Sequence, residues 1–213
     1  MEPCQGRGIR IPAPIRTAVF VAITLVPGCA LLFPPHVSVF GLQPTQPSSL
    51  EIDSTFRGTI WVEDFDNTGE FNTDRFVYRF PGTSAVSASR HHAWPGFASD
   101  VARDFVARNL SERFSGHVQE AMTPPADYLI EATVEDMSIV CDADRKMIRA
   151  SFELSYQISR KTGTSYQCSA TGCDTASVAI TRQDAASAAG AMADAIMTVS
   201  RHIGDRLVAD SRH

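Results

Sequence analysis

Residues 148–158 read Ile-Arg-Ala-Ser-Phe-Glu-Leu-Ser-Tyr-Gln-Ile, and this stretch decides the fold. Apolar side chains stand at every even position from Ile148 to Ile158, and polar side chains stand at the odd positions between them. Because successive side chains of a strand point to opposite faces, the pattern predicts a strand with one buried and one solvated face. Half-buried strands of this kind are typical of antiparallel sheets.

Similar alternation continues on both sides of this stretch. Residues 128–135 alternate before it, and residues 142–145 supply the turn between the two segments. After it, residues 161–164 predict a turn into a third strand through Tyr166 and Cys168. We therefore expect an antiparallel meander. Its solvated face also carries three apolar residues, which form either an interaction patch or scattered surface apolar residues: Leu129, Met137 and Met147.

Two helices are predicted by apolar residues that recur at the helical period. The first begins near Ala98, and the second runs from about Arg182 to Asp210. Thr181 and Asp184 have the spacing of a capping box before the second helix. Each helix is expected to bury one face only.

Shorter strands are predicted earlier in the chain, at residues 36–40, 59–62, 75–80 and 84–89. Together these elements predict an α+β fold in one domain, residues 36–213. We expect a mainly antiparallel sheet with the two amphipathic helices packed on one face.

The N-terminal residues have the pattern of an export signal. Arg7, Arg10 and Arg16 precede an apolar run of ten residues, from Thr17 to Val26. The run is shorter than the about 20 residues that a membrane-spanning helix needs. We therefore predict a signal peptide over residues 1–28. A membrane-anchor helix is the alternative if the run is continued past Pro27 and Gly28.

The sequence Leu25-Val26-Pro27-Gly28-Cys29 resembles a bacterial lipobox. This resemblance implies that diacylglycerol is attached to the thiol of Cys29, that the chain is cleaved before Cys29, and that the new amino group is acylated, typically with palmitate. Residues 29–35 would then form a lipidated tether. Ala30 stands where Asp would imply inner-membrane retention, so export to the outer membrane is expected.

The charge of the chain limits its partners. The 213 residues include 19 Lys+Arg and 24 Asp+Glu, which gives a formal net charge of −5. Removing residues 1–28 takes away three Arg and Glu2, and leaves 16 basic against 23 acidic side chains, a charge of −7. A chain with this balance is not expected to bind nucleic acid through its phosphates. Anionic lipid headgroups would repel it, so membrane attachment would come from the acyl chains. With 44% hydrophobic residues, the chain is also too apolar to be disordered.

We find no catalytic motif of the GxSxG, P-loop, GxGxxG or HExxH kind in the sequence. His91 and His92 are adjacent, so on a strand they point to opposite faces and cannot bind one metal ion. Glu63, Asp64 and Asp66 are an acidic group without the ligand spacing of a calcium loop. We expect no catalytic residue, no metal and no cofactor.

Three cysteines remain after the lipidated one: Cys141, Cys168 and Cys173. The spacing of Cys168 and Cys173 is compatible with a small disulfide loop or with two unrelated residues, and an odd number leaves at least one free thiol. Trp94 precedes the first helix and is expected to be a core or helix-entry residue.

The order of these elements resembles the ABC-type transport auxiliary lipoprotein family (PqiC-like proteins). The resemblance covers about residues 36–208 and rests mainly on Asp-Arg-Phe-Val-Tyr-Arg at 74–79 and on Trp94, with Ala126-Asp127-Tyr128-Leu129-Ile130 and the Ala-rich final helix. It implies a lipoprotein of the outer membrane, on its periplasmic face, that has no enzymatic activity.

Such a protein is expected to be an auxiliary component of an MCE-type ABC lipid transport system. The resemblance implies that it docks the periplasmic MCE-domain protein at the outer membrane, while a permease and an ATPase supply transport and energy. It leaves a homo-oligomer open. One alternative is a lipid-binding or envelope-assembly lipoprotein that acts independently and needs an apolar cavity. Another is a periplasmic enzyme that uses His91, His92 and the carboxylates around Asp64.

Overall fold

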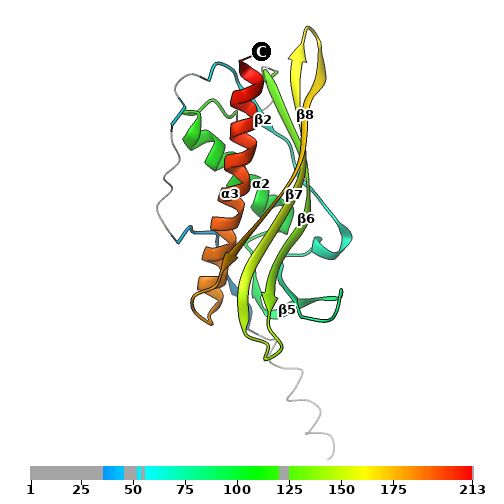
Figure 1. Ribbon diagram of the computed structural model, residues 1–213, viewed down its shortest axis with the longest axis vertical. Helices are drawn as coiled ribbons and strands as arrows, with labels where there is room; N and C mark the ends of the chain where they lie inside the picture. Colours follow the sequence, from blue (N-terminus) through cyan, green and yellow to red (C-terminus); the bar gives the residue numbers. More distant parts are fainter. Residues whose placement is uncertain (1–35, 46–51, 54–55, 120–124, 213) are drawn as a thin grey trace, which may run out of the picture. The chain divides into compact units, whose positions relative to one another are not determined.

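The computed structural model describes residues 36–45, 52–53, 56–119 and 125–212 (Figure 1). The predicted signal peptide, Cys29 and the tether lie outside the described residues. The chain separates into one unit over Met1–His36 and a second over Val37–His213, and only the second is described below.

The described residues form one eight-stranded sheet with the order β1-β5-β4-β6-β7-β8, in which β2 and β3 also pair with β6. The α+β class is confirmed. The strands are β1 (Ser38–Val39), β2 (Ile60–Val62), β3 (Asp66–Asn67), β4 (Arg75–Arg79), β5 (Val86–Ala93), β6 (Tyr128–Cys141), β7 (Met147–Thr162) and β8 (Ser165–Ala179). The described helices are α2 (Ala98–Arg113), α3 (Ala185–Ser211) and a 3-10 turn, η2 (Gly69–Phe71).

The predicted meander is confirmed in the long strands β6, β7 and β8. Both neighbours of β7 run antiparallel to it, and Phe152 stands opposite Met137 on one side and Ala176 on the other. The third strand is longer than we predicted, because it continues to Ala179. Its small Ser, Ala, Thr and Gly side chains carry little hydrophobic contrast, and strand periodicity depends on that contrast.

The short strands differ from the prediction in direction and length. β6 pairs in parallel with β2, β3 and β4, and β1 pairs in parallel with β5, so the sheet is mixed. β1 covers only Ser38–Val39 of the predicted range 36–40. β5 extends to Ala93, beyond the predicted end at residue 89. Periodicity indicates which face of a strand is buried, but the direction of pairing depends on connections distant in the sequence.

The sequence left open whether Leu129, Met137 and Met147 form an interaction patch or are scattered surface residues, and a β-bulge in β6 removes Met137 from the solvated face. The register with β7 shifts between Val134 and Asp136, so the residues beyond the shift change faces. Met137 is therefore in the core and only 1% exposed. Leu129 is 9% exposed, and Met147 is half-buried. The three residues do not form an exposed patch.

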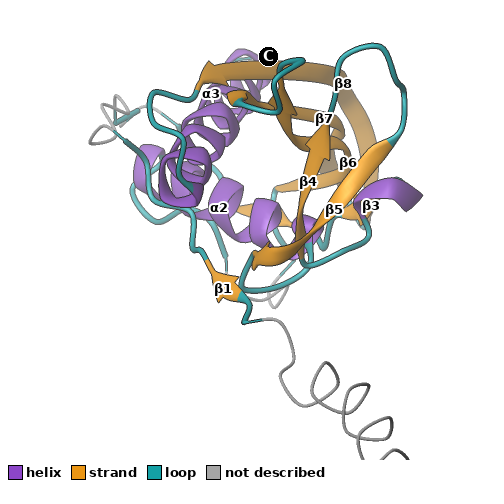
Figure 2. Ribbon diagram, turned by 90° about the horizontal axis from the view of Figure 1, so that it is seen from below, coloured by secondary structure: helices purple, strands orange, loops and turns teal. Residues whose placement is uncertain are grey.

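Seen end-on, the sheet curves, and α2 and α3 lie together on its inner side (Figure 2). α3 packs against β7 and β8, and α2 packs against α3 and β6. Packing of both helices on one face is as predicted. The space between the layers is filled by one continuous cluster of apolar side chains.

Trp94 is a core residue, as the sequence predicted. Its ring stacks on that of Phe76 with 4.0 Å between the ring centroids. Both side chains are buried, and Phe76 is fully inaccessible. From α3, Met192 and Ile196 join the same core cluster.

Gly172 in β8 makes room for Tyr156 of β7. A Cβ atom at position 172 would lie 2.6 Å from both the Oη and Cζ atoms of Tyr156. The Tyr156 ring is held in place because its hydroxyl donates a hydrogen bond of 2.6 Å to Asp174. We expect Gly172→Ala to lower the melting temperature clearly, whereas Gly69→Ala, which meets no atom within 4 Å, should not. Equal melting temperatures for the two variants would contradict this packing.

The N-cap of α3 is Asp184 and not the Thr181 of the predicted capping box. The Asp184 carboxylate accepts a hydrogen bond of 2.7 Å from the backbone N–H of Ser187. Thr181 lies three residues earlier than the cap, so its hydroxyl is not at the capping position.

This cap predicts a pH-dependent stability. The hydrogen bond from Ser187 lowers the pKa of Asp184 below 3.8, so the ionised cap stabilises the fold above that pH and is lost as the pH falls through the lowered value. We expect Asp184→Ala to lower the melting temperature at pH 7, and we expect this deficit to shrink once Asp184 is protonated, because the neutral carboxyl keeps only an uncharged acceptor oxygen. Asp184→Asn keeps a capping oxygen, so it should remain more stable than Asp184→Ala at both pH values. Thermal melts at pH 7 and at low pH measure the difference in melting temperature between the wild type and Asp184→Ala. A difference that is the same at both pH values would contradict this role of the cap.

Candidate functional site

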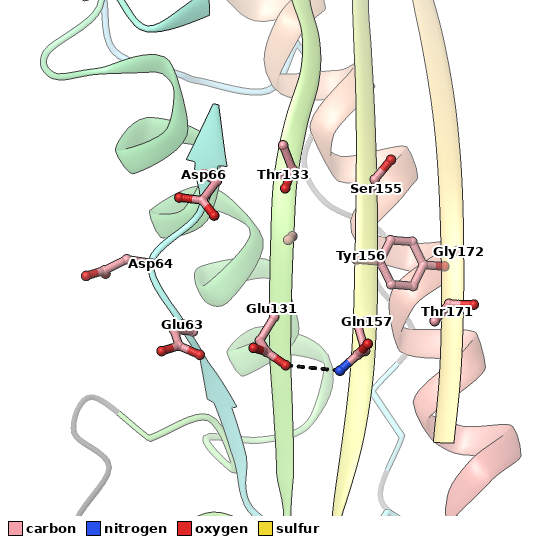
Figure 3. Close-up of a pocket in the computed structure, with 11 residues that line it drawn as sticks. Glu63, Asp64, Asp66, Glu131, Thr133, Ser155, Tyr156, Gln157, Thr171 and Gly172 are labelled. Carbon is pink, nitrogen blue, oxygen red and sulfur yellow. Dashed lines mark hydrogen bonds between the residues drawn. The ribbon is translucent and has the colours of Figure 1, made fainter. Parts of the chain in front are cut away.

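The outer face of the sheet carries an open polar depression of about 680 Å³ (Figure 3). It contains the acidic group singled out in the sequence. Its lining includes Glu63, Asp64, Asp66, Glu131, Gln157 and Thr171.

Strand register explains why these residues come together. The backbone N–H of Glu63 donates to the carbonyl of Ile130, which places Glu63 beside Glu131. Gln157 of β7 stands opposite Glu131, and its amide donates to the Glu131 carboxylate at 3.2 Å (Figure 3). On the other side of β7, Thr171 stands opposite Gln157.

The depression has the character of a solvated surface. Glu63, Asp64, Asp66 and Glu131 are all exposed, and Asp64 points away from β6 (Figure 3). Within the described residues, no group of three or more His, Cys, Asp or Glu side chains is arranged to hold a metal ion. Polar oxygens and amides on this face can accept and donate hydrogen bonds to another protein.

His91 and His92 lie near the end of β5, where their roles differ. His91 is exposed, whereas the His92 ring lies 5.7 Å from Phe40 and 5.8 Å from Phe76, measured between ring centroids. The Nδ1 atom of His92 is 3.0 Å from the Tyr78 hydroxyl. Burial, together with the charge of His91, lowers the pKa of His92 and favours its neutral form.

The residues of the enzyme alternative therefore lie in different places. His92 lines a second depression, which contains none of Glu63, Asp64 and Asp66. The contacts of His92 are with aromatic rings and a tyrosine hydroxyl, which is the environment of a packing residue.

The second depression is a groove of about 790 Å³ at the start of α3. Apolar atoms come from Phe40, Pro44, Met147 and Ala185, and polar groups come from Arg182 and Gln183. The sequence could not predict this groove, because its lining residues come from the segment after β1, from β5, from β7 and from α3.

The segment after β1 is fixed across α3 beside this groove. The backbone N–H of Thr45 donates to Asp194 at 3.1 Å, and the Thr45 hydroxyl donates to the same carboxylate. Gly190 allows the close approach, since a Cβ atom there would lie 2.8 Å from the Thr45 methyl group. Thr45, ten residues after the predicted tether, is thus held against the last helix.

Cys168 and Cys173 are exposed on β8, Cys141 is buried in β6, and all three thiols are free. Five positions along an extended strand separate Cys168 from Cys173, which is about 16 Å at 3.3 Å per residue. A disulfide needs Cα atoms within about 7 Å, so the small-loop alternative does not occur in this fold.

Neither a known protein-family model nor a curated protein sequence matches the chain. Among the described residues, no helix is long and apolar enough to cross a membrane.

Solved structures do match the fold. A Xanthomonas campestris protein of the DUF330 family has a TM-score of 0.67 at 16% identity, over 83% of this chain and 100% of its own. An uncharacterized protein has a TM-score of 0.62 at 11% identity, over 81% of this chain and 99% of its own. A Caulobacter crescentus protein described as a candidate lipoprotein has a TM-score of 0.36 at 17% identity, over 51% of this chain and 81% of its own. The first two likenesses establish that the domain has the fold of the DUF330 structure.

Proposed function

We propose that this protein is a lipid-anchored lipoprotein of the outer membrane that docks a periplasmic MCE-domain protein for an ABC lipid transport system. The observation that carries the proposal is the placement of the lipobox. Cys29 stands just before a folded domain with the fold of a DUF330 structure, and the same domain resembles the transport auxiliary lipoproteins in its element order.

The length of the tether sets the position of the domain. Residues 29–35 are seven residues, which reach at most about 25 Å when fully extended. The domain would therefore stay close to the leaflet that holds the acyl chains.

The domain would act by contact and not by catalysis. His92 lines one depression and packs against aromatic rings, whereas Glu63, Asp64 and Asp66 line the other and are exposed. The chain contains no phosphate-binding motif, so the energy for transport would come from the ATPase of the system.

A lipid-binding lipoprotein that acts independently is the second candidate. One observation favours it: the groove of about 790 Å³ falls within the range of pockets that hold small molecules, and apolar side chains form part of its wall. Phospholipid recovered with the protein after mild extraction, detected by mass spectrometry, would support this candidate.

Co-purification tests the proposed docking. The tagged full chain, extracted from membranes in mild detergent, is expected to retain an MCE-domain protein that mass spectrometry identifies. The matched control fuses residues 1–35 to an unrelated folded protein, which should be anchored equally but retain no MCE-domain protein. If both proteins recover the same partners, or if the full chain recovers none, the docking role is wrong.

A further inference from the structure

The last strand of the sheet, β8, has a long free edge. β8 spans 15 residues, Ser165–Ala179, and within the described part of the chain its only strand neighbour is β7. Free edges are normally protected against pairing by Lys, by Pro or by short length. β8 has no Lys, Arg or Pro, and its protective features are a bulge at Ser169 and the charged Asp174 on the helix side.

Side-chain cover over this edge is small. α3 packs on the inner side of β8, and Arg206 donates one hydrogen bond of 3.0 Å to the carbonyl oxygen of Thr171. A carbonyl oxygen has two lone pairs, so this contact leaves a second acceptor position. Thr171, Cys173 and Thr175 are exposed.

We propose that β8 pairs antiparallel with β8 of a second copy of this chain, about a two-fold axis at Thr171. This isologous pairing would extend the sheet across two domains. It is independent of the transporter partner, so the two proposals can fail separately.

The bulge makes the strand complementary to itself in this register. On β7, Ser159 stands opposite Cys168 and Ser155 opposite Cys173, with Ser169 as the extra residue. Cys168 and Cys173 consequently share the outer face, although five positions separate them. With Thr171 opposite Thr171 of the second copy, Cys173 faces Cys168 of the second copy, and outer residues meet outer residues throughout.

The charges of β8 also permit self-pairing. Asp174 is the one charged residue of the strand, and it faces the uncharged Gln167 of the second copy in this register. Its carboxylate is already hydrogen-bonded to the Tyr156 hydroxyl on the helix side. Thr–Thr pairs at the axis are favourable across antiparallel strands. No two charged residues of β8 therefore face each other across the contact.

Charge pairs at the axis test the register. The wild-type lipoprotein in detergent should have twice the protein mass of a monomer in sedimentation experiments. Thr171→Lys or Thr171→Glu alone should be monomeric, because like charges meet at the axis, and an equal mixture of the two should recover dimers. Ala143→Lys, in the exposed β6–β7 turn, adds the same charge elsewhere and should remain dimeric. A monomeric wild type, a dimeric Thr171→Lys variant, or a mixture that stays monomeric would overturn the proposal.

The native thiols give a second, independent test. The oxidant diamide takes two electrons and two protons from a thiol pair as a disulfide forms. Cys168→Ser and Cys173→Ser should each give no covalent dimer alone, whereas their mixture should give one through the remaining Cys173 and Cys168. Circular dichroism confirms that each variant is folded. If either variant alone forms as much covalent dimer as the mixture does, the proposed register is wrong.

Discussion

Replacing Cys29 by Ser is expected to move the protein from the membrane fraction to the soluble periplasmic fraction. The acyl chains are the proposed attachment, and each buried CH₂ contributes about 0.8 kcal/mol, so loss of all chains removes nearly the whole membrane affinity. The domain itself has a charge of −7 after removal of residues 1–28 and would not replace the anchor. Fractionation after labelling with a palmitate analogue measures both attachment and acylation.

Cys173→Ser is the matched control, because it removes an exposed thiol of the folded domain and should leave label and membrane fraction unchanged. If Cys29→Ser still sediments with membranes in high salt, the alternative of a membrane-anchor helix that continues past Pro27 and Gly28 gains support. Label retained in the Cys29→Ser variant would contradict the acylation site.

The second large effect is expected from Phe76→Ala. Phe76 is fully buried, stacks on Trp94 with ring centroids 4.0 Å apart, and also contacts Phe40, with centroids 5.7 Å apart. Removing a buried Phe side chain costs about 3–5 kcal/mol, through lost burial and the cavity that remains. Because domains are stable by only about 5–15 kcal/mol, the variant should unfold at much lower urea concentration.

Phe97→Ala removes the same side chain from an exposed position and should change the urea midpoint little, since Phe97 is 51% exposed. Equal midpoints for the two variants would show that Phe76 does not lie in the core. A large change in the slope of the Phe76→Ala transition would show instead that unfolding is no longer two-state.

The parts of the fold that followed from the sequence are those with strong hydrophobic contrast. Ile148 to Ile158 predicted β7, and the apolar repeats predicted α2 and α3, because one face of each element is buried in the core. The full length of β8 and the bulge in β6 were not predictable in this way. Small residues in β8 carry no clear period, and a bulge exchanges the faces of a strand without altering its composition.

The candidate site was predictable only in part. The acidic group at Glu63 was found in the sequence, but its neighbour Glu131 comes from β6, and strand pairing alone brings the two together. His91 and His92 are neighbours in the sequence, yet His91 is exposed and His92 packs against the rings of Phe40 and Phe76. The groove at α3 and the proposed self-pairing edge of β8 both depend on strand register, which we could not predict from the residue pattern of one sequence.

The most direct test of the account is mass spectrometry of the N-terminal peptide from the membrane-purified protein. We expect a peptide that begins at Cys29, with a diacylglyceryl group on its sulfur and an acyl group on its amino nitrogen. A peptide that contains Pro27 and Gly28 before an unmodified Cys29 would contradict the lipid anchor on which the proposed function rests.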